Sequence, residues 1–323
     1  MSTQILVGFT KERGTAWLYK QDLESPETNY CTGALTVAQV RRRLFGWHAV
    51  ELPMHITIPK GRQKGQSVPV AGRKAIVRDD TWQVIGTPSP TYKPQQYDKW
   101  LDMISSKWLK GSDLQIGVAG TLKGGAIGWL QLETESNHEA CGVEFRPHVL
   151  LATSFNGEIA TLGKMVSTIV VCDNTRSLTR HGGTPDISLT HDDLHDVLAT
   201  RAQFRDDFTK EITALSKMKV SDRDFDRYLI KSIPAKSTDS QQAKTRAVNT
   251  RDELRRMWQT DVRCAPFRGT AFGVVQTVNT WRQHHKPTRG SRSMLERTMV
   301  ETFTQANEIA DTQTATLIKE IIR

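Results

Sequence analysis

The sequence predicts an α+β fold, with an antiparallel sheet of β-hairpins and packing helices followed by a mainly helical C-terminal half. Two observations predict this order. Up to residue 183, short apolar runs alternate with turn signals such as Gly124-Gly125, a pattern typical of hairpins. From residue 184 onward, apolar residues recur at helical spacing. We therefore expect a sheet region over 1–183 and a helical region over 184–323.

Local patterns predict the elements of the sheet region. Thr36 can cap a helix that ends at Leu44. Residues 47–58 are typical of a strand interrupted at Pro53, and the basic, Gly- and Pro-containing stretch 59–74 predicts an exposed loop or β-hairpin arm. The same patterns predict hairpins of 74–78 with 82–86 and of 114–122 with 126–133, a helix over 95–109, and β-type segments in 148–154 and 159–172.

Capping patterns mark the helices of the second region. Ser or Thr followed three residues later by an acid occurs at Thr190, Ser221 and Thr250, each before an apolar stripe. We also expect helices over 270–284 and 293–322. Residues 232–247 are polar and low in complexity, which predicts a flexible linker because they can bury little apolar surface.

Composition excludes several classes of protein. No run of about 18 apolar residues could span a membrane, and the N-terminus lacks the pattern of a secretory signal. Without such a signal we expect the cytoplasm, a reducing compartment in which the cysteines would be buried small hydrophobes. The cysteines form no CxxC pair that would indicate a zinc site, and they are Cys31, Cys141, Cys172 and Cys264.

The chain is basic, with 44 Lys and Arg against 35 Asp and Glu and a formal charge of +9. Residues 244–323 hold 14 basic and 8 acidic residues, which is +6 of that total. An uneven surplus of this kind favours a polyanionic partner, since phosphate contacts supply most of the non-specific affinity for nucleic acids. A solubilising surface charge is the alternative.

No motif predicts catalysis or a cofactor. His191 and His195 have the i, i+4 spacing of a metal pair, but the HDDLH pattern lacks the expected Glu and favours a solvated helix start. In the glycine-rich stretch 117–128, Lys123 precedes the glycines and no hydroxyl follows, which favours a hairpin turn over a phosphate loop. Cys172 is better explained as an inert buried thiol than as a nucleophile. We therefore expect no catalytic residue, no metal and no enzymatic activity.

The basic stretch supplies the predicted phosphate contacts. Lys and Arg side chains there can follow a sugar-phosphate backbone. The first candidates are Lys60, Arg62, Lys64, Arg73 and Lys74, and the second are Arg41, Arg42, Arg43 and Lys123. Aromatic residues beside basic ones can stack on bases, and the candidates are Trp47, Tyr92 and Trp108. The alternative is burial, and we expect most of the eight tryptophans to fill the core, because aromatic residues dominate core burial.

Five runs in order resemble one family, the phage/plasmid-like proteins grouped as domain of unknown function 932. They are KAIVRDDTWQVIGTPSPTYKPQQ (74–96), AGTLKGGAIGWLQL (119–132), HVLLATSFNGEIATLG (148–163), TIVVCDNTRSL (168–178) and RGTAFGVVQTVNTW (268–281). The resemblance covers most of the chain between about 36 and 281. It departs from the family pattern at 168–172 and 281–284. It implies a phage or plasmid origin and a bacterial host cytoplasm, and leaves the activity open.

The expected architecture is similar in outline to that of phage single-strand annealing proteins of the RecT, Redβ and Erf type. That likeness favours a protein that binds single-stranded DNA and promotes annealing as a homo-oligomer, a ring or a filament, without a cofactor or a membrane. The alternative is a non-enzymatic interaction protein that inhibits or regulates a host factor in defence or development. A metal-dependent nuclease is a third possibility, but the sequence contains no cluster of carboxylates that would hold its metal.

Overall fold

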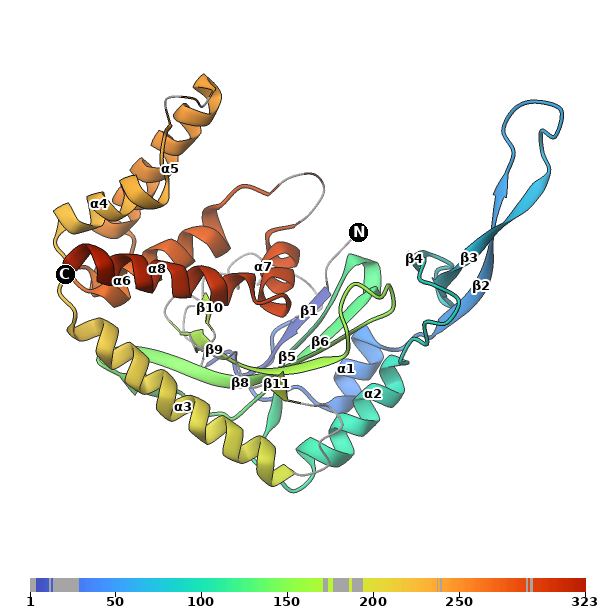
Figure 1. Cartoon of the computed structure of the whole chain (residues 1–323). Coiled ribbons are helices and arrows are strands. Elements are labelled where there is room, and N and C mark those ends of the chain that lie inside the picture. Colours follow the sequence, from blue (N-terminus) through green and yellow to red (C-terminus); the bar gives the residue numbers. More distant parts are fainter. Residues whose placement is uncertain are drawn as a thin grey trace.

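The computed structural model describes residues 4–11, 13, 29–170, 174–176, 186–187, 194–236, 238, 240–288, 290 and 293–323. The strands are β1 (Gln4–Val7), β2 (Ala49–Thr57), β3 (Ser67–Arg78), β4 (Val84–Gly86), β5 (Gln115–Leu122), β6 (Ile127–Glu133), β7 (His138–Ala140), β8 (Val143–Ser154), β9 (Leu162–Ile169), β10 (Asn174–Arg176) and β11 (Asp186–Ile187). The helices are α1 (Val37–Leu44), α2 (Tyr97–Ile104), α3 (Leu194–Lys217), α4 (Asp222–Ser232), α5 (Gln241–Thr260), α6 (Ala271–Thr280), α7 (Met294–Phe303) and α8 (Ala306–Ile322). The predicted α+β class is confirmed (Figure 1).

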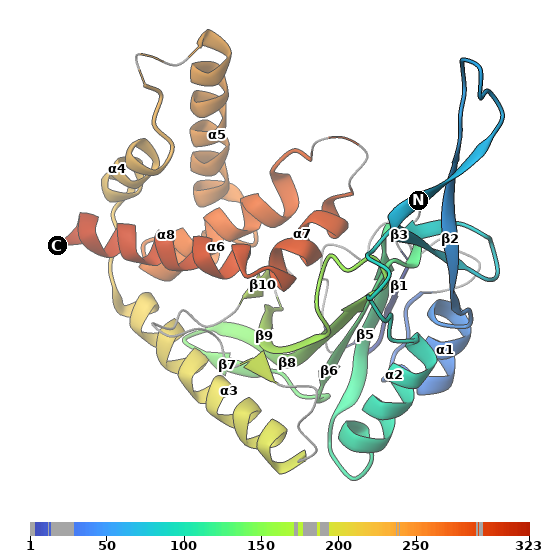
Figure 2. The same cartoon turned by 45° about the vertical axis from the view of Figure 1, so that its right-hand side comes forward.

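The main sheet has eight strands and is antiparallel throughout. Its central order is β1-β5-β6-β8-β9-β10, while β7 pairs with β8 and β11 with β9. The hairpin predicted around Gly124-Gly125 is present as β5 and β6, and Gly124 and Gly125 turn the chain at φ of 71° and 102°. The sheet curves into a half-barrel (Figures 1 and 2).

Both faces of this sheet are covered. On one face, residues such as Leu130 and Leu151 share a hydrophobic cluster with α1, α2, α3, α4, α5, α6 and α8. On the other, Trp129 and Leu150 pack with Met299 and Phe303 of α7. Alternate residues of each strand therefore pack into two different hydrophobic clusters, one on each face of the sheet. Because sheet and helices share one cluster, the helical half packs onto the sheet; the proposed boundary at 183/184 falls where the described residues are interrupted.

A second sheet, of order β2-β3-β4, holds the predicted arm. β2 and β3 form a long two-stranded ribbon that projects away from the rest of the molecule (Figures 1 and 2). We call residues 49–78 the arm. Its register shifts between Pro53 and His55, so the predicted interruption at Pro53 is present. A proline cannot donate to a ladder and is tolerated at such an edge position.

An aromatic cluster fixes to the body the foot of the arm, by which we mean the ends of β2 and β3 at residues 49–53 and 74–78 with the turn that follows at 79–83. The Trp47 ring lies 5.5 Å from Tyr97 and 5.4 Å from Phe155, centroid to centroid. The Arg78 guanidinium lies 4.2 Å from the Trp47 ring and donates to Gly124 O at 3.0 Å. The ribbon therefore leaves the body from a rigid base.

Several predicted helix starts are confirmed by their caps. Thr36 and Ser221 each form a complete capping box, and Thr270 accepts a hydrogen bond from the Gly273 amide. The predicted helix over 95–109 is α2, which a π-helical turn, Ser105–Leu109, extends. The predicted box at Thr190 lies outside the described residues.

Two predictions about the helical half are wrong. Residues 241–247 form the first turns of α5, not a linker, because Ser240 caps that helix by accepting from the Ala243 amide at 3.2 Å; Thr250 therefore lies inside the helix. The expected helix over 293–322 is divided into α7 and α8 at Gln305, whose φ of 62° is left-handed. Short polar residues favour helix only where a cap and neighbours support it.

The cysteine prediction holds for one of the three described residues. Cys264 is buried, and burial raises the pKa of its thiol to about 11. Cys31 is half-buried and Cys141 is exposed, because Cys141 lies in the tight turn between β7 and β8 with φ of 51°. Cys172 lies outside the described residues. Among the helices that the structure describes, none is both long and apolar enough to cross a membrane.

Candidate nucleic-acid interface

The tip of the arm is a tight loop closed by backbone hydrogen bonds. Ile58 N donates to Gln66 O at 3.0 Å, and Gly65 N donates to Ile58 O at 2.9 Å. Gly61 and Gly65 adopt φ of 89° and 85°, a conformation that glycine reaches without steric cost. These glycines let the chain reverse while the side chains between them point outward.

Three cationic side chains occupy this tip. Lys60, Arg62 and Lys64 are exposed, and none of them forms an ion pair or side-chain hydrogen bond with another described residue. Residues 58–66 contain no Asp or Glu, so the loop carries a local charge of about +3 that its own sequence does not neutralise. Among the predicted phosphate contacts, these three form a compact group of exposed cations without a described acidic partner.

The two predicted residues lower on the arm differ from each other. Arg73 is exposed and donates through Nη1 to Thr87 O at 3.1 Å, which leaves its charge without a carboxylate among the described residues. Lys74 is 12% exposed and its Nζ lies 2.6 Å from Glu51 Oε2. Lys74 therefore stabilises the pairing of β2 with β3 instead of facing solvent.

Most of the second candidates are also engaged. Arg41 pairs with Asp102 and Lys123 pairs with Glu158. Arg43 donates to Asn29 Oδ1 at 2.6 Å, while Arg42 is exposed and has no ion pair with a described residue. All four belong to the foot or the body, so the structure separates them from the tip (Figure 1).

Two of the aromatic stacking candidates are wrong, because Trp47 and Trp108 are 5% and 1% exposed and fill the core. The hydroxyl of Tyr92 donates to Ser154 O at 2.5 Å. Among the large aromatic residues that the structure describes, Trp82 is the exposed one, at 67%, in the turn from β3 to β4 with φ of 54°. A bulky residue with positive φ is unusual and strained.

The signal for Trp82 in the sequence is indirect. It directly follows the predicted hairpin turn of Asp79, Asp80 and Thr81, and residues next to turns tend to face solvent. Its backbone amide donates to Arg78 O at 2.9 Å, which holds it in place. Arg78 also pairs with Asp80 at 2.6 Å and lowers the pKa of that carboxyl, so the turn is rigid.

Five described arginines of the basic C-terminal region pair with acids. Its arginines are largely neutralised by nearby acids, as Arg263 is by Asp261 at 2.6 Å. Further pairs are Arg255 with Asp226, Arg256 with Glu253, Arg268 with Asp222 and Arg282 with Glu301. These five arginines are therefore less available to a polyanionic partner than the cations of the tip.

Buried polar groups join the sheet to the helices. Arg176 Nε of β10 donates to Asp311 Oδ2 of α8 at 3.2 Å, and Asn279 Nδ2 of α6 donates to both oxygens of Asp311 at 3.0 and 2.8 Å. Burial raises the pKa of Asp311 to about 6 even beside Arg176. These contacts join β10 to α6 and α8 through buried side chains.

A second buried group lies on the sheet. Glu133 is fully buried and pairs with Arg13, while Arg146 Nε lies 3.7 Å from Glu133 Oε2. His148 is the residue paired with Glu133 across β6 and β8. Burial lowers the pKa of His148 to about 3, so the imidazole is neutral in the folded chain.

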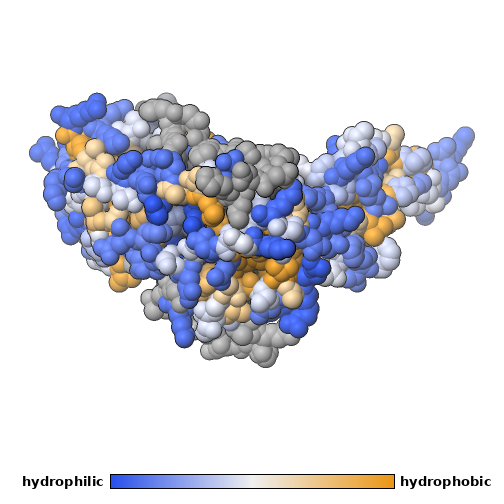
Figure 3. Space-filling view, turned by 90° about the horizontal axis from the view of Figure 1, so that it is seen from below, coloured by the Kyte–Doolittle hydropathy of each residue, from blue (hydrophilic) through white to orange (hydrophobic). Residues whose placement is uncertain are grey.

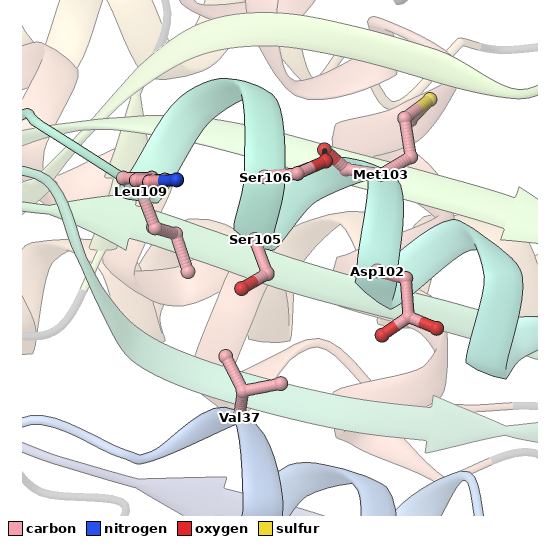
Figure 4. Close-up of a pocket in the computed structure, with 7 residues that line it drawn as sticks. Val37, Asp102, Met103, Ser105, Ser106 and Leu109 are labelled. Carbon is pink, nitrogen blue, oxygen red and sulfur yellow. Dashed lines mark hydrogen bonds between the residues drawn. The ribbon is translucent and has the colours of Figure 1, made fainter.

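Metal chemistry has no support in the part of the chain that the structure describes, where no group of three His, Cys, Asp or Glu could hold an ion. His191 lies outside that part. An open depression lies between α1 and α2, lined by Val37, Asp102, Met103, Ser105, Ser106, Leu109 and Lys110 (Figure 4). Because the Asp102 carboxylate in it already pairs with Arg41, the depression offers few convergent polar groups.

The structure thus defines an α+β protein with a curved antiparallel sheet, a helical half and a projecting basic ribbon. The chain belongs to the family described as domain of unknown function DUF932, whose model matches residues 84–303. No curated protein and no solved structure matches it. The matched part begins after the arm and after Trp82, so family membership carries no information about either.

Proposed function

We propose that this protein binds single-stranded DNA through the tip of its arm and promotes strand annealing in recombination or replication. The observation that carries the proposal is the group of three exposed, unpaired cations at Lys60, Arg62 and Lys64. Such side chains release counterions from phosphates, which supplies affinity without a cofactor. A phage or plasmid origin, a bacterial cytoplasm and a ring or filament of copies belong to the same proposal.

Arg73, lower on the arm, extends the proposed track, since its charge is paired with no described carboxylate. Arg42 also has no described ion pair, but it lies on α1 of the body. Lys74, Arg41 and Lys123 contribute less, because Glu51, Asp102 and Glu158 hold them. Trp82 at the foot offers a flat exposed ring on which an unpaired base can stack. The proposed mechanism therefore combines backbone contacts at the tip with stacking at the foot.

The experiment is a salt titration of binding to a labelled oligonucleotide. Each phosphate contact to a single strand adds about 0.7 to the slope of log affinity against log salt, so the variant K60Q/R62Q/K64Q should lower that slope by about 2. A matched control, K210Q/K231Q/R256Q, removes three exposed cations that already have acidic partners. Wild-type protein that fails to bind single strands, or equal slopes for the two variants, would contradict the proposal.

A second candidate function is that of an interaction protein that inhibits or regulates a host factor. The observation that favours it is apolar exposure on the small sheet: Leu52, Ile56, Val68, Trp82 and Val84 are 37–67% exposed. Exposed apolar patches mark protein contacts. A wild-type chain that binds no oligonucleotide at low salt, yet retains a partner whose binding K60Q/R62Q/K64Q leaves intact, would support this second function.

A further inference from the structure

A second group of exposed cations lies where α3 ends and α4 begins, a segment of residues 217–223 that we call the junction. Lys217, Lys219 and Arg223 are exposed, and none of them forms an ion pair or side-chain hydrogen bond with another described residue. The end of α3 and the start of α4 lie on the opposite side of the molecule from the arm (Figures 1 and 2). Seen from below, hydrophilic residues predominate on that side (Figure 3). The junction therefore repeats the chemistry of the tip at a separate place.

Backbone hydrogen bonds hold the junction in a defined conformation. Val220 N donates to Gly269 O at 3.0 Å. Ala271 N donates to Met218 O at 2.9 Å. Met218 packs against the core and Val220 is 3% exposed, whereas Lys219 between them is exposed. The alternation presents the charge of Lys219 at a fixed position on the surface.

The acids near the junction are already held by other groups. Arg268 pairs with Asp222 and lowers the pKa of that carboxyl. Hydrogen bonds from Ser221 and Arg227 lower the pKa of Asp224 to about 2. With the two acids that pair with Arg255 included, the group keeps a local charge of about +2. It consists of six cations, Lys217, Lys219, Arg223, Arg227, Arg255 and Arg268, and four acids, Asp222, Asp224, Asp226 and Asp252.

Local structure does not account for two of the three unpaired cations. Arg223 lies in the first turn of α4, where the partial positive charge of a helix start disfavours a cation. Lys219 pairs in a β-bridge with Thr270, the N-cap of α6, and lies two residues before Ser221, the N-cap of α4. Lys217, by contrast, ends α3, where a cation is favourable. An external anion therefore explains Lys219 and Arg223 better than stability of the fold does.

We propose that the junction binds a second segment of single-stranded DNA, separate from the segment that the tip binds. Three exposed cations can contact phosphates of one strand and release their counterions. The inference rests on the proposed function for its choice of nucleic acid, because a protein that anneals strands has to hold two of them. Since the tip and the junction lie on opposite sides of one chain, a short strand bound at one leaves the other free.

The test counts the oligonucleotides that each chain binds at saturation. Single strands of about eight nucleotides are titrated at low salt into chain held well above the dissociation constant, because single-strand sites cover about 4–16 nucleotides. Wild type should bind two per chain, whereas K217Q/K219Q/R223Q and K60Q/R62Q/K64Q should each bind one. The control K210Q/K231Q/R256Q, which loses the same formal charge from paired cations, should bind two. All four proteins should unfold at the same urea concentration, since the substituted side chains are exposed.

The two proposals fail separately in this titration. If K217Q/K219Q/R223Q still binds two oligonucleotides, or if the control loses one as well, the junction site is overturned and the tip is unaffected. A wild-type chain that binds one oligonucleotide, and loses it in K60Q/R62Q/K64Q, also overturns the junction site. If K60Q/R62Q/K64Q binds two while K217Q/K219Q/R223Q binds one, the junction is supported and the tip fails. A wild-type chain that binds none overturns both.

Discussion

The arm and the main sheet use the same cationic residues in opposite ways. In the sheet, Arg146, Lys164 and Arg176 are 1–2% exposed, and each is held by carboxylates or carbonyl groups. On the arm, Lys60 and Arg62 are exposed and no described acid pairs with them. The comparison teaches that a formal charge of +9 mixes structural cations with those available to a partner. Local acid content, more than total charge, separates the two groups.

The largest expected effect concerns Arg176, a buried cation of the main sheet. Arg176→Met removes one member of a buried ionic group and leaves Asp311 and Glu211 without their cation. We expect a loss of about 3–5 kcal/mol in the free energy of unfolding, measured by urea denaturation. By contrast, K60Q/R62Q/K64Q should change that free energy by less than about 0.5 kcal/mol. Equal losses in the two proteins would remove the distinction between body and arm.

The pH dependence of stability sharpens the comparison at Asp311. Its pKa is raised from 3.8 to about 6 in the folded chain, so the fold favours the protonated form. Its contribution is present below about pH 4 and is lost as pH rises through 6, a change of about 3 kcal/mol at 1.36 kcal/mol per unit. The unfolding free energy of wild type relative to Asp311→Asn should therefore fall by that amount between pH 4 and 7.

The comparison with Asp311→Asn is needed because His148 also makes the unfolding free energy depend on pH. Its pKa is lowered from 6.5 to about 3, so its contribution is present above about pH 6.5 and is lost as pH falls. This trend opposes that of Asp311 in the same range, and it is common to wild type and Asp311→Asn. A difference between the two proteins that does not vary with pH would show that Asp311 is not perturbed.

Glycines give a smaller contrast between the same two regions. A Cβ on Gly117 of β5 would lie 1.4 Å from Glu133 Oε1, a clash with a fully buried side chain. We expect Gly117→Ala to cost about 1–3 kcal/mol of unfolding free energy, or more if Glu133 loses its pairing. At the tip, Gly61 has no atom within 4 Å of that position but has φ of 89°. Gly61→Ala should cost about 1–2 kcal/mol, from backbone strain alone, in the same thermal or urea measurement.

The smallest expected effect concerns Trp82. Trp82→Ala should leave stability nearly unchanged, because the ring is 67% exposed. If Trp82 stacks on a base, the affinity for a single-stranded oligonucleotide should fall about tenfold, and Trp82→Phe should retain most of it. Fluorescence anisotropy measures both. If Trp82→Ala binds the oligonucleotide as tightly as wild type while K60Q/R62Q/K64Q does not bind it, the binding site includes the tip and excludes Trp82.

Sequence reasoning succeeded where the signal was local. The cap at Thr36, the turn at Gly124-Gly125 and the arm over 59–74 each depend on residues within a few positions. A partner that is distant in sequence is harder to anticipate. Lys74 was predicted to contact phosphate without knowledge of its pairing with Glu51, 23 residues earlier, which depends on the register of β2 and β3.

The same limit applies to the aromatic residues. Trp47 and Trp108 lie near basic residues in the sequence, yet both are buried in the core, since large rings bury the most apolar surface. Trp82 follows Arg78 at the same spacing as Trp47 follows Arg43, but Asp79 and Asp80 lie between them, and it was missed as a stacking candidate. The missed start of α5 has a similar cause, because residues 241–247 are polar and give no apolar stripe.

The contacts that tie β9 and β10 to the C-terminal helices also bear on how the chain acquires its structure. Lys164 Nζ donates to Thr302 O at 2.7 Å, and the two residues are 138 positions apart. Arg176 and Asp311 are separated by 135 positions. Contacts between such distant residues slow folding. At a synthesis rate of about 5–20 residues per second, the C-terminal helices emerge many seconds after β9 and β10. Lys164 and Arg176 can therefore be buried against their partners only after synthesis of the C-terminal helices.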